Sequence, residues 1–246
     1  MTNKKHDKDE LYEKRPYGRQ SVLTELERAK KYRNKRVLVA GCGAGARVFD
    51  LYFYGANITA VDQSRSAIQF IRSQFNELDC EPSELIVDDL TDIELPAGEF
   101  DYVICYGVLH HTPNPEAILR NLRDALQTDG SLEIILYHRK SFARIERNIV
   151  ESLHDWFRVG DILPNNIKRK IEWWDKYENP IWKTYTRKEA RSLVESSGFT
   201  VDELWLSNSP FGQFTNWLLP PLIKYYLSTK LSDYRWHIHI NAKPQT

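Results

Sequence analysis

The residues best suited to bind a ligand stand where an apolar stretch of the chain gives way to a cluster of glycines. Lys35–Ala40 is that stretch, and Gly41, Gly43 and Gly45 follow it at alternate positions. Glycine lets the backbone turn sharply and come close to a ligand, so this pattern is typical of a turn that holds a nucleotide. With Ala46 the cluster also satisfies the GxGxxA form of the dinucleotide fingerprint, so the turn alone leaves the nucleotide open.

A carboxylate follows the next apolar stretch of the chain. Asp62 comes directly after Ile58–Val61, at the position where a second strand would end beside the glycine turn. Its two oxygens can accept hydrogen bonds from both hydroxyls of a ribose, a group that several nucleotide cofactors share. Asp88 and Asp89 follow a third apolar stretch in the same way. The three carboxylates are therefore predicted to lie at one edge of a sheet.

Two neighbouring histidines, His110 and His111, are the candidates for proton transfer. They follow the apolar stretch Tyr102–Cys105, so they would lie at the carboxyl edge of the sheet, where open α/β folds bind ligands. Histidine titrates near neutral pH and can take a proton from an OH or NH group. Because adjacent residues of a loop point in different directions, at most one of the two is expected to act as the base, and we prefer His111.

The elements that must position these residues alternate between strands and helices. Short apolar stretches predict the strands, and apolar residues at a spacing of three or four predict the helices. The predicted strands are 35–40, 58–62, 85–87, 102–105, 132–137, 200–206 and 235–241. The predicted helices are 19–34, 48–52, 65–78, 114–122 and 186–198. Gly130 is predicted to separate a helix from the strand after it. Strands that alternate with helices imply a parallel sheet covered on both faces.

Three further motifs, in a fixed order after the glycine turn, give the chain a family resemblance. They are Ile86-Val-Asp88-Asp89-Leu90, Leu95-Pro-Ala-Gly-Glu-Phe100-Asp101-Tyr-Val-Ile and Val108-Leu-His110-His111-Thr-Pro-Asn-Pro. Together they resemble class I S-adenosylmethionine-dependent methyltransferases, in particular the branch that methylates small molecules such as quinone and isoprenoid precursors. The resemblance covers about residues 35–138. It implies a Rossmann-like α/β fold: a seven-stranded, mostly parallel sheet, helices on both faces and an antiparallel last strand.

The resemblance also implies which residues bind S-adenosyl-L-methionine. These are Gly41, Cys42, Gly43, Asp62, Gln63, Asp89, Leu90 and Cys105. The glycine turn would pass the methionine part of the cofactor, and Asp62 would hold the ribose. Asp89 would bind the adenine amino group with Leu90 packed on the ring, while Asp88 competes for the same role. Cys105 and the residue after it would lie beneath the sulfonium.

One departure from the family pattern lies two residues before Gly41. The family usually has Asp or Glu there, whereas this chain has Val39. The missing acid removes an anchor for the amino group of the cofactor, so either the cofactor binds more weakly or another group replaces the acid. A nucleotide-binding protein without catalysis is therefore one alternative. An NAD(P)-dependent oxidoreductase is the other, although its second half should supply a catalytic Tyr-Lys pair or an equivalent.

Composition and charge limit the partners that we expect. The chain of 246 residues has 34 Lys and Arg against 34 Asp and Glu, so steering of nucleic acid by net charge is not expected. No apolar run is long enough to cross a membrane, and the charged N-terminus does not resemble a signal peptide. Cys42, Cys80 and Cys105 lack the CxxC spacing of a zinc or redox site, so we expect no metal, and reduced thiols in a cytoplasmic protein.

The domain organisation follows from where the alternation of strands and helices is lost. Residues 1–18 are predicted to be a flexible tail and N-terminal lid, and residues 19–246 a methyltransferase domain. Insertions at about 139–185 and 208–232 are rich in aromatic residues, and they are predicted to form helical lids around a small, apolar or aromatic methyl acceptor. Peripheral contact with a membrane through 208–232 stays open, and so does the oligomeric state.

Overall fold

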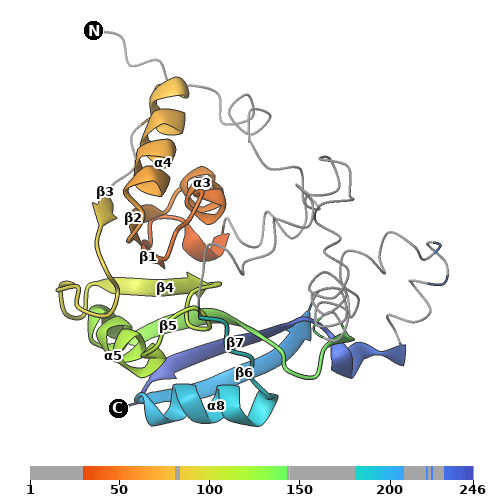
Figure 1. Ribbon diagram of the computed structural model, residues 1–246. Helices are drawn as coiled ribbons and strands as arrows, with labels where there is room; N and C mark the ends of the chain where they lie inside the picture. Colours follow the sequence, from red (N-terminus) through yellow and green to blue (C-terminus); the bar gives the residue numbers. More distant parts are fainter. Residues whose placement is uncertain are drawn as a thin grey trace, which may run out of the picture.

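One seven-stranded sheet forms the centre of the protein (Figure 1). The computed structural model describes residues 30–80, 84–142, 144, 181–207, 220, 223 and 230–245. Within the sheet the strands have the order β3-β2-β1-β4-β5-β7-β6. Their bounds are β1 (Arg36–Ala40), β2 (Asn57–Asp62), β3 (Glu84–Val87), β4 (Phe100–Tyr106), β5 (Leu126–Tyr137), β6 (Phe199–Ser207) and β7 (His237–Pro244). The predicted tail at 1–18 and most of the two predicted insertions lie outside the described residues.

The direction of the strands confirms the predicted Rossmann-like fold. The first five strands pair in parallel, while β7 lies between β5 and β6 and is antiparallel to both. Parallel strands end at a common edge, so the loops after β1, β2, β3 and β4 meet there. Across this part of the sheet Val39 pairs with Ile104, and Ile104 pairs with Glu133. These three side chains therefore share one face of the sheet.

Helices cover both faces of the sheet, as predicted. Figure 1 shows α3 (Ala46–Phe53) and α4 (Arg65–Glu77) grouped on one side, and α5 (Pro115–Ala125) and α8 (Arg187–Ser196) on the other. The buried apolar residues accordingly form two clusters. One contains Phe49 and Phe75 of the first pair of helices, and the other contains Leu122 and Val194 of the second pair. Removal of these apolar surfaces from water is the main force that holds the layers together.

Three helices, α4, α5 and α8, begin at residues whose side chains cap free N–H groups. The Ser64 hydroxyl accepts from the Ala67 N–H and Asn114 Oδ1 from the Ala117 N–H, at 3.3 and 3.2 Å. Thr186 and Glu189 form a capping box at the start of α8, in which each side chain bonds the other residue's backbone N–H. These caps fix where the three helices begin.

Gly130 does not separate a helix from a strand, in contrast to the prediction. β5 begins at Leu126, directly after α5, and Gly130 lies inside it. The pairing of β4 with β5 shifts there, because Phe100 lies opposite Leu126 whereas Tyr102 lies opposite Ser131. A Cβ at Gly130 would lie 2.9 Å from Leu126 Cδ2 and 3.0 Å from a backbone oxygen. The glycine therefore serves the close packing of an irregular strand pair and ends no element.

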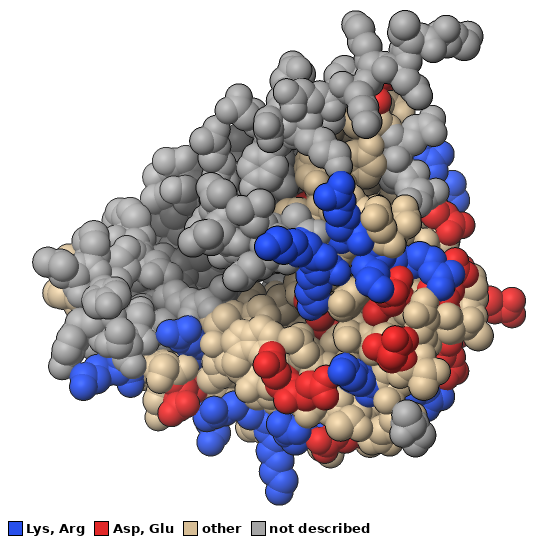
Figure 2. Space-filling view, turned by 180° about the vertical axis from the view of Figure 1, so that it is seen from behind, with Lys and Arg blue, Asp and Glu red and all other residues tan. Residues whose placement is uncertain are grey.

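Acidic and basic side chains lie next to one another on the described part of the surface that Figure 2 shows. Some of these neighbours form ion pairs, for example Lys35 with Asp101 at 2.9 Å and Arg191 with Glu195 at 3.2 Å. Both pairs are largely exposed, so each contributes little to stability. Among the described residues, no helix has the length and apolar character needed to cross a membrane.

Candidate ligand-binding site at the carboxyl edge of the sheet

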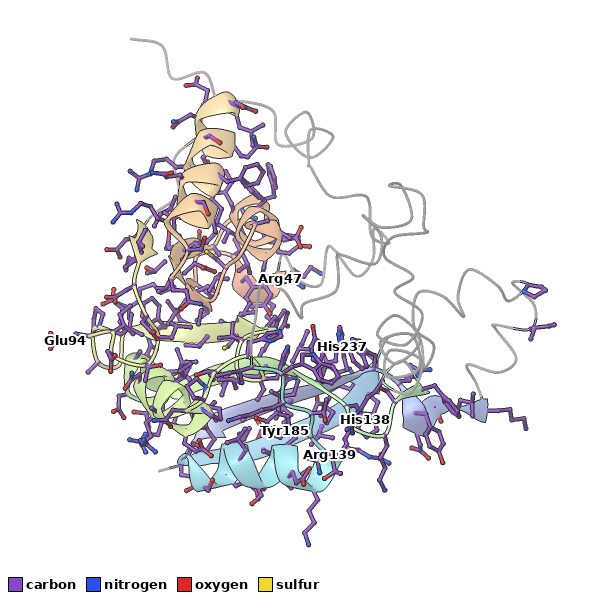
Figure 3. All side chains as sticks on the ribbon, in the orientation of Figure 1. Arg47, Glu94, His138, Arg139, Tyr185 and His237 are labelled. Atoms are coloured by element: carbon purple, nitrogen blue, oxygen red, sulfur yellow. The ribbon has the colours of Figure 1, made fainter. Side chains whose placement is uncertain are left out.

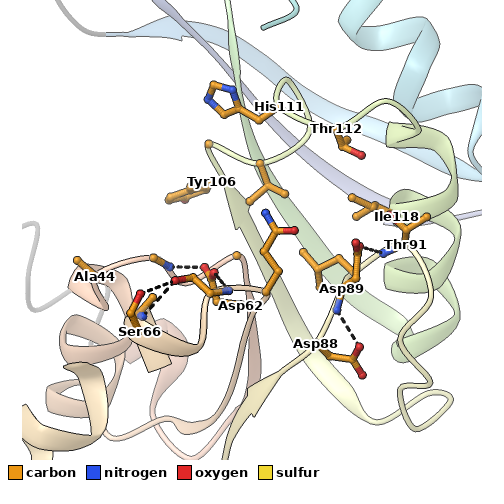
Figure 4. Close-up of a pocket in the computed structure, with 18 of the residues that line it drawn as sticks. Ala44, Asp62, Ser66, Asp88, Asp89, Thr91, Tyr106, His111, Thr112 and Ile118 are labelled. Atoms are coloured by element: carbon orange, nitrogen blue, oxygen red, sulfur yellow. Dashed lines mark hydrogen bonds between the residues drawn. The ribbon is translucent and has the colours of Figure 1, made fainter. Parts of the chain in front are cut away.

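A cavity of about 810 Å³ opens at the carboxyl edge of the sheet (Figure 4). Its wall is made by the loops after β1, β2 and β3, by the first turn of α4 and by the loop after β4. Gly41, Gly43, Asp62, Asp89 and His111 all contribute to this wall. The fold thus brings together residues that are far apart in the sequence, at the edge where the sequence predicts them.

The glycine turn after β1 has a backbone that other residues would not tolerate. Gly41 has φ +72°, and a Cβ there would lie 2.1 Å from Cγ2 of Val108. The Gly41 N–H donates to the Val61 carbonyl at 2.8 Å, which holds the turn against the end of β2. Gly41 therefore lets the loop after β1 pass directly beneath the loop after β4.

Asp62 ties this turn to the start of α4. Its Oδ2 accepts from the Gly43 N–H at 2.7 Å, and its Oδ1 accepts from the Ser64 N–H at 2.9 Å. A carboxylate oxygen can accept two hydrogen bonds, so each oxygen keeps one lone pair for a ligand. Asp62 can therefore fix the loop and bind two hydroxyl groups at the same time.

The two acids after β3 point in opposite directions (Figure 4). Asp88 accepts the Asp89 N–H through Oδ1, and Asp89 accepts the Thr91 N–H through Oδ1, both at 2.8 Å. The Asn121 side chain of α5 donates to the carbonyls of Leu90 and Thr91, which fixes this loop on the helix. Leu90 is buried, while both carboxylates are exposed at the cavity. The loop thus offers an apolar surface beside an acceptor of hydrogen bonds.

His111 is the histidine that lines the cavity. Its Nδ1 lies 2.9 Å from the carbonyl oxygen of Ile181. Because a carbonyl oxygen can only accept, Nδ1 carries the proton of this bond, and Nε2 is then the basic nitrogen of the neutral ring. The loop is held by a second bond to the same segment, from the Lys183 N–H to the His110 carbonyl at 2.8 Å. These bonds hold the His111 ring and its loop in one position at the cavity wall.

Rings gather around Tyr137, at the end of β5. The ring centroids of His110 and Trp236 lie 3.7 and 4.6 Å from that of Tyr137. His111, Trp182 and His237 each lie 5.8 Å away. We call these six residues the ring cluster. Aromatic side chains bury large apolar areas and stack on flat molecules, so this end of the edge is suited to an apolar or aromatic group.

Tyr106, at the end of β4, connects the cavity to a buried carboxylate. Its hydroxyl donates to Glu133 Oε2 at 2.7 Å, and Lys31 and Tyr32 donate to Glu133 Oε1. Burial alone would raise the pKa of Glu133, but these three donors outweigh it and hold that pKa below its ordinary value. Glu133 is therefore an ionised acceptor that keeps the Tyr106 ring in one position.

The structure brings most of the predicted site residues together. Those that line the cavity are Gly41, Gly43, Asp62, Gln63, Asp89, Leu90 and His111. Three others lie outside its described wall. Cys42 lines a smaller neighbouring cavity, while Cys105 and His110 are completely buried, the first in the apolar core and the second under the Tyr137 ring. Neither Cys105 nor His110 therefore belongs to the described wall of this cavity.

Cys42 and Cys105 have the properties of unreactive thiols. Burial raises the pKa of both Cys42 and Cys105 to about 12, and Asp62 adds to the effect at Cys42. Cys42, Cys80 and Cys105 are all free. In the described part of the chain, no three His, Cys, Asp or Glu side chains are grouped so that they could hold a metal ion.

The sequence reasoning missed several residues that shape the site. Glu133 is a lone carboxylate in the apolar stretch Leu132–Leu136, and that exception to the pattern was the available signal. Arg47, Tyr137 and Trp236 carried no such signal, because nothing in their spacing distinguishes them from ordinary helix and strand residues. Figure 3 shows Arg47 at the start of α3.

Comparison with known proteins agrees with the fold. Residues 38–134 match the family described as "Methyltransferase domain", which confirms the resemblance predicted from the sequence. The matched range contains the glycine turn, both predicted acids and His111, and ends inside β5.

Two curated relatives and one solved structure illustrate the similarity. The ubiquinone biosynthesis O-methyltransferase of Glaesserella parasuis is 32% identical over 117 residues, 44% of this chain and 48% of the relative. That of Alkalilimnicola ehrlichii is 34% identical over 146 residues, 55% of this chain and 58% of the relative. The matches thus span about half the length of these relatives. The structure of an S-adenosylmethionine dependent methyltransferase from Mesorhizobium loti is 15% identical, with a TM-score of 0.58 over 89% of this chain and 97% of that one.

Proposed function

We propose that the chain transfers a methyl group from S-adenosylmethionine to a small, apolar or aromatic acceptor. The observation that carries the proposal is one wall of the cavity, where the Gly41 turn, Asp62 and Asp89 follow three neighbouring parallel strands. The matching family and the names of the similar proteins support the same activity. The predicted NAD(P) alternative shares the glycine turn and Asp62, so the experiment below includes it.

The residues of this wall fit the adenosine part of the cofactor. The lone pairs that remain on the Asp62 carboxylate can accept the two ribose hydroxyls. Asp89 can accept the adenine amino group through Oδ2, since the Thr91 N–H occupies Oδ1. Leu90 gives the ring an apolar surface. When it is bound, the cofactor supplies a methyl group on a sulfonium, which is already an activated leaving group.

His111 supplies the one proton transfer that an OH or NH acceptor requires. Its Nδ1 is committed to the Ile181 carbonyl, so Nε2 would take the proton of the acceptor. Positioning provides the rest of the rate, because two reacting groups held in line react far faster than in free solution. His110, which is buried, serves to pack the loop.

The ring cluster would hold the acceptor. It adjoins the cavity through His111, which belongs to both. Trp182 and Trp236 lie 6.0 Å apart and both lie beside Tyr137, so a flat apolar molecule could stack on these rings. A cytoplasmic location and a small-molecule partner complete the proposal, and the three free thiols support the former.

A thermal-shift experiment with two ligands tests the cofactor. S-adenosylhomocysteine should raise the melting temperature by several degrees at saturating concentration, while NADH should leave it unchanged. A shift with NADH alone would establish the oxidoreductase instead. Incubation of the protein with methyl-labelled S-adenosylmethionine and a small-molecule extract, followed by mass spectrometry, should then show a labelled product. Binding of S-adenosylhomocysteine without any labelled product would favour a non-catalytic protein.

A further inference from the structure

A second, smaller cavity of about 330 Å³ adjoins the first one. Gly41, Ala44 and Tyr106 line both cavities, so the two meet at the glycine turn. The smaller one reaches from there beneath the first turn of α3, where Arg47 and Asp50 form part of its wall. It is therefore the place that a ligand bound in the large cavity would enter if it extended past the glycine turn.

The charges of the two cavities differ. The charged side chains that line the large cavity, among the described residues, are the carboxylates of Asp62, Asp88 and Asp89. The small cavity has one cation and one anion, Arg47 and Asp50. S-adenosylmethionine ends in an α-amino acid, whose carboxylate and ammonium each need an opposite charge. The described wall of the large cavity has a counter-charge for the ammonium alone, whereas the small cavity has one for each group.

Arg47 and Asp50 form a pair that matches both charges of an amino acid. They lie one turn apart on α3, with Nη1 of Arg47 3.4 Å from Oδ2 of Asp50, and their side chains are 29% and 21% exposed. A guanidinium has five N–H donors and a carboxylate about four acceptor positions, so this ion pair uses only part of the bonding capacity of either group. The partly buried setting strengthens such contacts relative to open solvent.

A neighbouring ring holds the arginine at the junction of the cavities. The Arg47 guanidinium lies 5.1 Å from the centroid of the Tyr106 ring, a cation–π contact. The Tyr106 hydroxyl in turn donates to the buried Glu133, which keeps the ring in place. Val39, where the sequence lacks the family's usual acid, lines the same cavity as an apolar side chain. The wall at Val39 therefore offers no charge, and the charges are on α3 instead.

We propose that the Arg47–Asp50 pair is the subsite for the amino-acid end of the cofactor. Arg47 binds the α-carboxylate, and Asp50 binds the α-ammonium in place of the acid that Val39 replaces. The proposal rests on the proposed function, since it assumes that the adenosine part binds at Asp62. The proposal thus gives α3 a role in binding the cofactor, in addition to its apolar packing on the sheet.

Two ligands that differ only in the amino-acid end test this subsite by calorimetry. S-adenosylhomocysteine carries that end, whereas 5′-methylthioadenosine has the same adenosine and sulfur without it. Arg47→Gln should weaken S-adenosylhomocysteine binding about 10- to 100-fold, because it removes a charge-assisted hydrogen bond. Asp50→Asn should weaken it about 3- to 30-fold. Both variants should bind 5′-methylthioadenosine within about twofold of the original protein.

The control is Arg191→Gln, which removes the exposed arginine of the Arg191–Glu195 pair on α8 and should change neither affinity. Binding of 5′-methylthioadenosine shows that each variant is folded. Unchanged affinity of Arg47→Gln for both ligands, or an equal loss for both, would overturn the subsite while the proposed function stands. If the original protein binds neither ligand, the proposed function fails, and the subsite fails with it.

Discussion

The two ends of the carboxyl edge of the sheet carry different kinds of chemical groups. At the β1–β2–β3 end the cavity wall consists of backbone turns and carboxylates, and Asp62 is held by two N–H groups of the turns that it joins. At the β5–β7–β6 end the edge consists of rings, with Tyr137 at the centre of the ring cluster. The first end can recognise a polar nucleotide through fixed hydrogen bonds, and the second can recognise an apolar surface through its shape.

This difference explains why one end can be deduced from sequence and the other cannot. The backbone geometry of the turn requires glycine at position 41, and the ribose requires a hydrogen-bond acceptor at Asp62. Few residue types can therefore serve at these two positions. Many combinations of rings can bind an apolar group, so no residue spacing in the sequence indicates such a site. We expect the two ends to respond to substitution in different ways, and the following predictions test that separation.

The largest effect is expected where the two ends meet, at His111. His111→Ala should lower kcat about 10²- to 10⁴-fold, because only the transition state loses the base. Its affinity for S-adenosylhomocysteine should stay within about twofold. The rate is measured as transfer of labelled methyl from S-adenosylmethionine into the product found in extracts.

His110→Phe is the matched control for this prediction. It keeps a ring of similar shape under Tyr137, so it should change the rate by no more than a few-fold and act mainly on the melting temperature. Equal losses of rate in both variants would remove the distinction between base and packing. A small loss in His111→Ala would mean that positioning alone accounts for catalysis and that the acceptor is already nucleophilic.

The next largest effect is expected at the nucleotide end. Asp62→Asn should weaken binding of S-adenosylhomocysteine about 10- to 100-fold, because the amide cannot accept hydrogen bonds from both ribose hydroxyls. Asp202→Asn is the control, since this exposed acid lies on β6 and does not line the cavity. Calorimetry measures both affinities. Unchanged binding in Asp62→Asn would remove Asp62 from the site.

A smaller effect is expected where the loops after β1 and β4 pass each other. Gly41→Ala would place a Cβ 2.1 Å from Val108 Cγ2, and should lower the free energy of unfolding by about 2 kcal/mol more than Gly98→Ala. Gly98 also has a positive φ, +62°, but nothing lies within 4 Å of its Cβ position, so its variant carries backbone strain alone. Chemical denaturation measures both values. Equal losses would show that the close approach of the loops contributes nothing.

The smallest effect is expected in the ring cluster and depends on pH. Burial, with the nearby His239, lowers the pKa of His237 from 6.5 to about 4. Between these values the unfolded chain binds more protons than the folded one, so stability is full above pH 6.5 and falls as the pH drops toward 4. His237→Phe should reduce the loss between pH 7 and pH 5 by about 1–2 kcal/mol, measured by denaturation at each pH. An unchanged loss would mean that His237 is accessible to water.

The features that could be predicted from the sequence also differ in kind from those that could not. The alternation of strands and helices was predicted from local patterns, and the antiparallel β7 from the family resemblance. The prediction for Gly130 was wrong, because a glycine inside an irregular strand pair cannot be distinguished in the sequence from a glycine that ends a helix. Cys105 was assigned to the cofactor by the family resemblance, and in the structure its side chain lies in the apolar core. Which face a residue takes depends on register, and register is set by pairing with other strands.

The crystal structure of the protein in complex with S-adenosylhomocysteine tests the central claim most directly. The account predicts the ribose within hydrogen-bond distance of both Asp62 oxygens, the adenine on Leu90 beside Asp89, and the sulfur facing Tyr106 and His111. The ring cluster should remain open to a second molecule. Ligand density packed on Tyr137 and Trp236, with the glycine turn and Asp62 left without ligand contacts, would contradict the assignment of the nucleotide to the β1–β2–β3 end.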